Sequence, residues 1–257
     1  MPDGPPVNEP AGSARVQRKP TRERPMASEN LRYEQKGPVA LLTMDDGKAN
    51  ALSHDMIDAL NEALTRAEAE AQAVLLAGRP GRLCAGFDLS VMSAGRETAL
   101  SLVSKGGNLL MRMFGYPRPL VLACTGHAMA AGALLLLASD LRIGARGDFK
   151  IALNEVSIGM SLPAFGVELA RARLSKRHFT RAVLQSHVFD PEAARDAGYL
   201  DETETPEKLL ETALERATAL SALKAPAFGA TKDRERGSII AAVRENLEED
   251  IAQMAGV

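Results

Sequence analysis

The stretch LVLACTGHAMAAGALLLLASDLRIGA, residues 120–145, decides the fold of this chain. It is apolar over about the length of a membrane span, but a threonine, a histidine and two glycines interrupt it near the middle. A buried strand, a tight turn, a buried helix and a second strand explain this pattern better than a span does. The stretch therefore predicts strands over 120–125 and 141–145, with a helix over 131–138 between them.

Strand and helix also alternate outside this stretch. Apolar residues favour strands over Val39–Met44 and Ala73–Ala77, and Ser53 is a good N-cap for a helix between them. A further helix is expected over 97–114, where a glycine and a proline end it. This order predicts an α/β fold with a largely parallel sheet and helices on its faces. After Pro163 the pattern is helical nearly to the end, over 166–175, 177–185, 191–197, 206–223 and 239–254.

Composition and charge exclude several kinds of function. The chain has 257 residues, with 46% hydrophobic and 25% charged residues, which is ordinary for a globular protein. Its formal net charge of -2 gives no general electrostatic case for nucleic-acid binding. Two cysteines, Cys84 and Cys124, favour a reducing compartment, so we expect a cytoplasmic protein. The four histidines have no metal-ligand spacing, and no metal site is predicted.

The first residues differ in composition from the rest. Residues 1–28 are rich in Pro, Gly, Ser and Arg and have no apolar period, which predicts a disordered tail. This segment lacks the apolar core of a secretory signal. The remaining chain divides into an α/β part over 29–200 and a mostly helical part over 201–257.

Two turns rich in glycine and alanine carry the first chemical signal. One contains Gly86 and Phe87 in CAGFDL (residues 84–89), and the other contains Ala131 and Gly132 at the start of an apolar helix. Backbone N–H groups at such turns can donate to a negatively charged oxygen, although small residues also simply allow turns to pack tightly. A third segment, LNEVSIGMSLP (153–163), has a single acid, Glu155. One carboxylate beside an oxyanion site suits proton removal next to a carbonyl.

Together these segments resemble the motifs of the crotonase superfamily, also called the enoyl-CoA hydratase/isomerase family. CAGFDL is similar to the family's C-A-G-x-D-[LI] loop, and GKANALS at 47–53 is similar to its early N-A-L motif. GHAMAAGALLLLASDLRI, at 126–143, resembles its glycine-rich segment, with Ala130 and Ala131 in place of two glycines. LNEVSIGMSLP resembles its P-E-x-x-x-G-x-x-P segment, with Asn154 replacing the usual proline. The resemblance covers nearly all of the chain outside the tail.

The resemblance implies a fold and an assembly. The implied fold is crotonase-like (ClpP/crotonase) and of class α/β, with a ββα spiral core over 29–200. The helical region 201–257 is then expected to take part in oligomerisation, as a homotrimer or hexamer. An apolar stripe at helical spacing can cover this subunit's own active site or a neighbour's, and it consists of Ile240, Val243, Leu247 and Ile251.

The resemblance also implies roles for individual residues. The oxyanion hole is expected at the N–H groups of Phe87 and Ala131. The expected substrate is an acyl-CoA thioester, so coenzyme A is part of the substrate and no separate cofactor or metal is needed. The residues expected to contact the thioester or its CoA portion are Lys48, Ala49, Ala51, Ala85, Asp88, Leu89, Leu134 and Lys232.

The number of carboxylates separates the candidate reactions. Hydratases of the family use two glutamates, and here the position of the first is Leu134, whereas the second is Glu155. Because leucine cannot activate water, efficient hydration is not expected. One base can instead move a proton within a 3-enoyl thioester, and the LNE segment resembles the version seen in Δ3,Δ2-enoyl-CoA isomerases. Burial should raise the pKa of Glu155, and the apolar neighbours expected to bury it are Val156, Ile158, Met160 and Leu134.

Two alternatives to the isomerase remain open. The enzymatic one is an enoyl-CoA hydratase or another crotonase-family lyase or hydrolase. Efficient hydration would require an acid distant in sequence, such as Glu97 or Glu168, to fold into the site. The other is an acyl-CoA-binding protein without turnover. Leu134 and the alanines that replace glycines favour this second alternative, whereas Glu155 argues against it.

Several residues near the motifs have structural explanations. Asp140 and Asp88 are expected to cap or pair within the fold, and Glu155 itself can be a partner of a backbone N–H. Cys84 has no histidine placed to activate it as a nucleophile. His127 is expected to be a packed, hydrogen-bonded residue.

Overall fold

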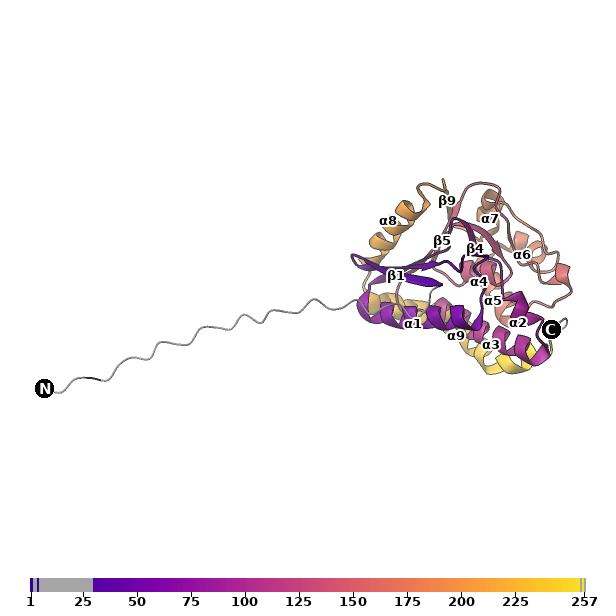
Figure 1. Ribbon diagram of the computed structural model, residues 1–257, viewed down its shortest axis with the longest axis horizontal. Helices are drawn as coiled ribbons and strands as arrows, with labels where there is room; N and C mark the ends of the chain where they lie inside the picture. Colours follow the sequence, from indigo (N-terminus) through magenta and orange to yellow (C-terminus); the bar gives the residue numbers. More distant parts are fainter. Residues whose placement is uncertain (2–3, 5–29, 255, 257) are drawn as a thin grey trace.

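A six-stranded sheet with helices on both faces forms the centre of the protein, as the computed structural model shows for residues 1, 4, 30–254 and 256 (Figure 1). The first pairing, β1 with β2, is antiparallel, and the other four pairings are parallel. The predicted α/β class and largely parallel sheet are therefore confirmed. Apart from Met1 and Gly4, the tail predicted over 1–28 lies outside the described residues. In sheet order the strands are β1 (Leu31–Lys36), β2 (Val39–Met44), β3 (Ala73–Ala77), β5 (Leu120–Cys124), β7 (Leu141–Ala145) and β9 (Glu202–Glu204).

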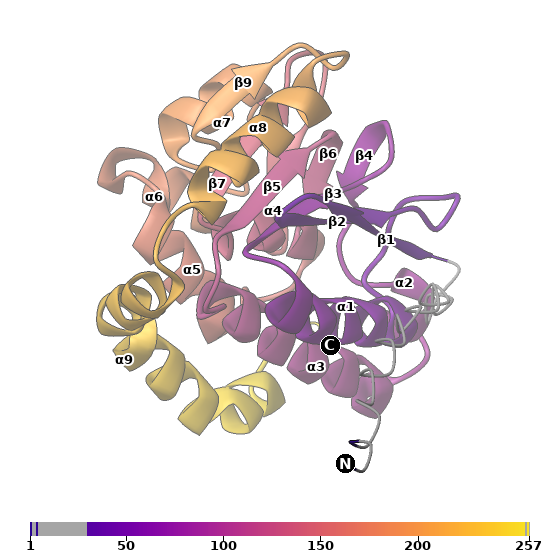
Figure 2. The same ribbon diagram turned by 90° about the vertical axis from the view of Figure 1, so that its left-hand side faces the viewer.

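Nine α-helices surround this sheet in the described part of the chain. They are α1 (His54–Glu70), α2 (Leu89–Met92), α3 (Arg96–Phe114), α4 (Ala131–Leu137), α5 (Ala164–Arg173), α6 (Lys176–Val183), α7 (Pro191–Ala197), α8 (Leu209–Ser221) and α9 (Ala225–Ala252). Figure 2 shows α8 in front of the sheet and α1 along its lower side. In the described residues no helix is long and apolar enough to cross a membrane.

The two faces of the sheet bury separate cores because side chains alternate along each strand. On β3, Leu75 and its neighbours on one face pack against α8, whereas Val74 and Leu76 face the larger core that contains α1, α3 and α4. All five residues of β3 and of β5 are buried. This burial on both faces explains why these strands appear in the sequence as continuous apolar runs.

A second, smaller sheet is not predicted by the sequence. It consists of β4 (Gly81–Cys84), β6 (Gly126–Met129) and β8 (Ile151–Ala152), which are parallel neighbours in that order. The sequence suggests only a loop over 78–88 and a turn before Ala131. Strands of two to four residues are too short to produce a recognisable apolar period. A Cβ on Gly126 would overlap the backbone of Gly81, so glycine is needed where β6 meets β4.

The C-terminal helix differs from its prediction. It begins at Ala225 rather than at residue 239, and a proline occupies its first turn, where no N–H partner is needed. The early part of α9 contains glycines and charged residues, so its apolar period becomes visible only later in the helix. Val243, Leu247 and Ile251 of the apolar stripe are buried, and α9 contacts α3 and α5 of the same chain. The stripe is therefore covered within the subunit.

Candidate active site

Three chain segments meet at the carboxyl edge of the small sheet. Phe87 follows β4, Ala131 follows β6, and Glu155 follows β8. Because these strands are parallel neighbours, their carboxyl ends lie at the same edge, where parallel sheets commonly bind ligands. The small sheet thus brings together the three segments that the sequence analysis singled out separately.

The N–H groups of Phe87 and Ala131 lie close together without acceptors in the described residues. The backbone groups on either side of the Phe87 N–H are hydrogen-bonded to Leu52. Leu52 N–H donates to Gly86 O (2.8 Å), and Asp88 N–H donates to Leu52 O (3.1 Å). Ala131 is the first residue of α4, where an N–H has no partner within the helix. A Cβ placed on Gly86 would lie 3.9 Å from the Ala131 nitrogen, so the two turns are in contact. Two adjacent donors of this kind can hold one oxyanion.

Ala130 holds the second turn in a conformation that glycine prefers. Its φ of 50° and ψ of -121° correspond to the first central position of a type II′ turn. For a residue with a Cβ, such backbone strain costs about 1–3 kcal/mol. Ala130 N–H donates to Ala152 O at 2.9 Å, and Ala130 O accepts from Ala133 N–H at 2.9 Å. Because ψ of Ala130 orients the following peptide, the strained conformation sets the direction of the Ala131 N–H.

Glu155 is a buried carboxyl group with an unusual pKa. It is 8% exposed, and burial raises its pKa from 4.5 to about 7, opposed only by its own backbone N–H. Its Oε2 has no hydrogen-bond partner in the described residues. It immediately precedes the 3-10 helix η1 (Val156–Ile158). A carboxyl group with this pKa can both accept and return a proton near neutral pH.

The four apolar residues expected to bury Glu155 differ in their exposure. Val156 and Ile158 of η1 are 45% and 56% exposed, so much of their apolar surface faces solvent. Leu134 is buried and Met160 is half-buried, and their contact with Glu155 stays a prediction. Proximity in sequence was a poor guide here because successive side chains of a short helix point in different directions.

Leu134 occupies the position at which hydration would need a second catalytic acid. It is 1% exposed, and its Cδ1 lies 3.5 Å from the position of a Cβ on Gly166. Glu97 is exposed, and Glu168 forms an ion pair with Arg171 at 3.3 Å. The pKa of Glu155 is shifted by burial and by a backbone N–H, and no charged side chain contributes to the shift. Among the described residues, Glu155 therefore has no second carboxylate close enough to act with it.

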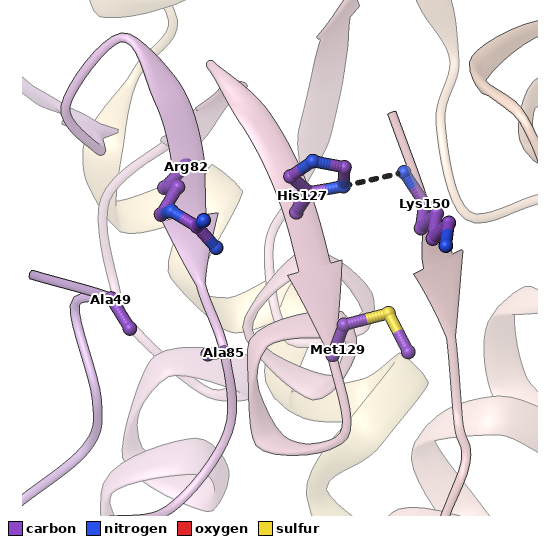
Figure 3. A pocket seen from close by; sticks show the side chains of 6 residues that line it. All are labelled: Ala49, Arg82, Ala85, His127, Met129 and Lys150. Carbon is purple, nitrogen blue, oxygen red and sulfur yellow. Dashed lines mark hydrogen bonds between the residues drawn. The ribbon is translucent and has the colours of Figure 1, made fainter. Parts of the chain in front are cut away.

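A pocket of 240 Å³ lies beside the three short strands (Figure 3). Two of the residues expected to contact coenzyme A line it, Ala49 and Ala85, together with three basic or imidazole side chains. Those three are Arg82 on β4, His127 on β6 and Lys150 just before β8. The sequence analysis did not identify Arg82 or Lys150, because a single basic residue in a loop resembles any solvated residue. Only the pairing of the strands places both around one cavity.

His127 is hydrogen-bonded and packed, as expected. Its Nδ1 accepts from the backbone N–H of Lys150 at 3.0 Å, and its ring stands edge-on to Phe149 at 5.5 Å between centroids. Burial lowers the pKa of His127, and the charges of Arg82 and Lys150 lower it further. The imidazole is thus a neutral member of a pocket whose charge comes from Arg82 and Lys150.

Four other predicted contact residues lie on the segments that lead to this edge. Lys48 and Leu89 are exposed, Leu89 to 77%, and are available to a ligand. Ala51 is half-buried and lies just before the bridge that joins Leu52 to Phe87. Asp88 is the N-cap of α2, and its side chain accepts from the Ser90 N–H at 2.8 Å. The role of Asp88 is therefore structural at least in part, which was the alternative considered for it.

Lys232 is not brought to this site. Its ammonium group is buried and contacts Asp140 Oδ2 at 2.7 Å and Tyr116 O at 2.7 Å. Asp140 also pairs with Arg236 at 2.8 Å and accepts from the Leu120 N–H, which confirms that Asp140 is structural. Because the ammonium group of Lys232 is already paired with Asp140 inside the fold, the structure does not support the expected contact between Lys232 and a CoA phosphate.

The structure does not support a cysteine nucleophile or a bound metal ion at this edge. Cys84 is buried, and burial raises the pKa of its thiol to about 12, which disfavours the nucleophilic thiolate as expected. Groups of three or more His, Cys, Asp or Glu side chains that could hold a metal ion are absent from the described residues.

Comparison with known proteins establishes the family. A family model described as enoyl-CoA hydratase/isomerase matches residues 34–253. The chain belongs to this family, and its sheets and helices are those of the crotonase fold predicted from the motifs.

Two solved structures and one curated protein sequence are among the proteins similar to this chain. The structure of an enoyl-CoA hydratase/isomerase family protein from Pseudomonas syringae is 42% identical, with a TM-score of 0.86, and the alignment covers 88% of this chain and 99% of that one. Human mitochondrial Δ3-Δ2-enoyl-CoA isomerase is 25% identical, with a TM-score of 0.83 and coverage of 87% and 90%. A probable enoyl-CoA hydratase of Bacillus subtilis is 31% identical over 131 residues, which is 49% of this chain and half of the relative's length.

Proposed function

We propose that this family member shifts the double bond of a 3-enoyl-CoA to give the conjugated 2-enoyl-CoA. The observation that carries the proposal is a single buried carboxyl group, Glu155, at an edge where two backbone N–H groups have no acceptor in the described residues. Glu155 takes a proton from C2 and the electron pair moves onto the thioester oxygen. The protonated Glu155 then returns its proton to C4, the electron pair forms the C2–C3 double bond, and the carboxylate is regenerated.

The pKa of Glu155 supports both halves of this transfer. With a pKa of about 7, a substantial share of the carboxyl groups is ionised at neutral pH and ready to accept the proton. The same value makes the protonated form an effective donor for the second half of the reaction. Burial, the cause of the raised pKa, also excludes the water that would compete for the proton.

The two N–H groups supply the electrostatic part of the mechanism. The enolate formed after loss of the C2 proton carries its charge on the thioester oxygen, and Phe87 N–H and Ala131 N–H are the donors proposed to hold it. Groups fixed in the backbone need no reorganisation when the charge appears, and loss of one such donor typically costs about 10²–10³-fold in rate. Ala131 fills this role as well as glycine would, because only its N–H is used.

Leu134 is the feature that favours isomerisation over hydration. Hydration needs water to be activated while a proton is delivered, and the buried leucine can do neither. The relatives are mostly named hydratases, and hydration by this chain would require another acid to reach Glu155. Glu97 lines a separate pocket with Glu248, and Glu168 lines another with Asp250. An acyl-CoA-binding protein without turnover would not need the strained turn and the buried acid together.

The basic pocket of Figure 3 is proposed to bind phosphate groups of coenzyme A. Arg82 and Lys150 provide positive charge, and Ala49 and Ala85 provide a small apolar wall next to it. Ala85 immediately precedes the turn of Gly86 and Phe87, so a CoA chain leaving this pocket can reach the oxyanion site. We also propose that no separate cofactor is needed. A homotrimer or hexamer and a cytoplasmic location remain predictions.

The test compares two reactions of the same protein. Purified wild type is mixed with a 3-enoyl-CoA, and absorbance of the conjugated thioester is followed. Crotonyl-CoA is then supplied, and loss of that absorbance measures hydration. We expect isomerisation to be faster. Hydration at an equal or higher rate would overturn the single-carboxylate mechanism.

Substitution of Glu155 identifies the base. Glu155→Gln keeps the shape of the side chain, and isomerisation should fall by about 10²–10⁴-fold because no other group takes its place. Binding of the CoA ester should change little, since the N–H groups and the basic pocket are intact. Glu97→Gln is the matched control, which removes an exposed carboxylate and should leave both rates unchanged. Near-normal turnover in Glu155→Gln would refute the assignment.

A further inference from the structure

Helix α3 contains two consecutive glycines near its middle, Gly106 and Gly107, and both are buried. Glycine is one of the least favourable residues inside a helix, because its backbone loses the most conformational freedom there. A Cβ on Gly106 would meet the ring of Phe87, and a Cβ on Gly107 would meet the ring of Phe165. The glycine pair therefore makes room for two aromatic rings, and one of them belongs to a proposed oxyanion donor.

The Phe87 ring lies directly against the backbone of α3 at Gly106. A Cβ on Gly106 would overlap Phe87 Cε1 and lie 2.5 Å from Phe87 Cζ, so even the smallest side chain would displace the ring. Phe87 is half-buried and packs against the larger core. We refer to the space that Gly106 leaves for this ring as the Gly106 notch. Because the tip of the ring fills the notch, it cannot move closer to α3.

The peptide group between Gly86 and Phe87 is held on its carbonyl side by Leu52. Gly86 O accepts from Leu52 N–H at 2.8 Å. The carbonyl and the N–H of a trans peptide point in opposite directions, and the described residues contain no cis peptide bond, so this hydrogen bond directs the Phe87 N–H away from Leu52. Gly86 has a φ of 112° and no side chain, so it resists rotation of this peptide only weakly. The direction of the N–H therefore depends also on what holds Phe87 itself.

The Gly106 notch restrains Phe87 on the side of its ring. The ring is joined through Cβ to the Cα that carries the N–H, so displacement of the ring turns the backbone of the same residue. A donor that turns away from its acceptor weakens steeply, since hydrogen bonds favour a nearly straight N–H···O arrangement. We propose that Gly106 is a positioning residue for the oxyanion site, because it admits the Phe87 ring and so fixes, together with Leu52, the direction of the Phe87 N–H. This inference rests on the proposed use of that N–H as an oxyanion donor and adds the residue of α3 that sets its direction.

Gly106→Ala tests the proposal with two measurements. The added methyl should lower kcat for a 3-enoyl-CoA by about 10–100-fold, which is part of the cost of losing one donor, with KM unchanged within about twofold. The second measurement needs no turnover, since infrared difference spectroscopy records the carbonyl band of a bound saturated acyl-CoA that is isotope-labelled at its carbonyl carbon. Hydrogen bonds to the carbonyl oxygen lower its stretching frequency, and this lowering should be smaller in Gly106→Ala than in the wild type.

Gly107→Ala is the matched control at the adjacent position. Its Cβ would lie 2.9 Å from Phe165 Cδ1 and 3.2 Å from Leu247 Cδ1, so it also crowds the buried side of α3, but its nearest neighbours are these two residues rather than Phe87. Thermal unfolding compares the stability of the two variants. Gly107→Ala should change stability but leave kcat and the carbonyl band at their wild-type values.

Phe87→Leu should rescue the Gly106→Ala variant. Leucine lacks Cε1 and Cζ, the two ring atoms nearest to the added methyl, and keeps the backbone N–H. In the Phe87→Leu background, Gly106→Ala should therefore cost no more than about twofold in kcat. If Gly106→Ala alone does not fold, Phe87→Leu alone carries the test. It leaves the Gly106 notch partly empty and should lower kcat and weaken the carbonyl shift, and unchanged values there would overturn the proposal.

An unchanged kcat or an unchanged carbonyl band in a folded Gly106→Ala would overturn the proposal. An equal loss of kcat in Gly107→Ala, or in the Phe87→Leu background, would overturn it as well, because crowding of α3 would then explain the effect. The proposed function can fail separately. If the wild type does not isomerise a 3-enoyl-CoA but the carbonyl band of the bound ester still responds to Gly106→Ala, the proposed reaction fails and the positioning role of Gly106 stands.

Discussion

Glu155→Gln should change how the stability of the protein depends on pH. The folded-state pKa of Glu155 is about 7, above its ordinary value of 4.5, because burial disfavours the charge. The folded protein therefore binds this proton more tightly than the unfolded chain does. The stabilisation that results is fully present below about pH 4.5 and is lost as the pH rises through about 7. Glutamine has no proton to lose, so the variant should not show this decline.

The size of the effect follows from the two pKa values. Between about pH 5 and pH 8, the folded carboxyl group goes from almost fully protonated to about nine-tenths ionised, while the unfolded one is mostly ionised throughout. Integration of this difference gives a loss of about 2.5 kcal/mol of unfolding free energy in the wild type relative to Glu155→Gln. Contributions of all other titrating groups are common to both proteins and cancel in the comparison.

Urea unfolding measures this difference directly. The wild type and Glu155→Gln are unfolded at a fixed protein concentration at several pH values between about 5 and 8, and their unfolding free energies are subtracted. Glu97→Gln serves as the control, since an exposed carboxylate should give a nearly constant difference. A difference between wild type and Glu155→Gln that stays constant within about 1 kcal/mol would show that Glu155 ionises normally, which would remove the physical basis of its role as a base.

Three further predictions address the turn, the buried ion pair and the assembly. Ala130→Gly should raise the unfolding free energy by about 0.5–1 kcal/mol, because glycine tolerates φ of 50°, and thermal unfolding would detect the gain. Lys232→Met should lower it by about 3 kcal/mol by breaking the buried pair with Asp140, while KM for the CoA ester stays unchanged; a raised KM in a folded variant would restore the predicted contact with CoA. Light scattering at micromolar concentration should give at least a trimer, and a monomer would contradict the assembly implied by the family resemblance.

The sequence by itself predicted four of the six strands of the main sheet, the chemical motifs and Glu155 as the candidate base. Val39–Met44, Ala73–Ala77 and Leu120–Cys124 are mostly apolar runs of five or six residues, so local pattern was enough to predict them. Glu155 stood out because it is the single acid in its segment. The structural role of Asp140 also followed from its place at the end of an apolar helix.

Tertiary structure alone decided how the site is assembled. β4, β6 and β8 are held by long-range pairing rather than by local preference, so neither their existence nor the shared edge could be predicted from local patterns. The same holds for burial, which left Val156 and Ile158 exposed beside the buried Glu155. The exposure and charge of a side chain depend on segments that approach from elsewhere in the chain. For that reason the sequence identified the candidate reacting groups, and only the fold showed what surrounds them.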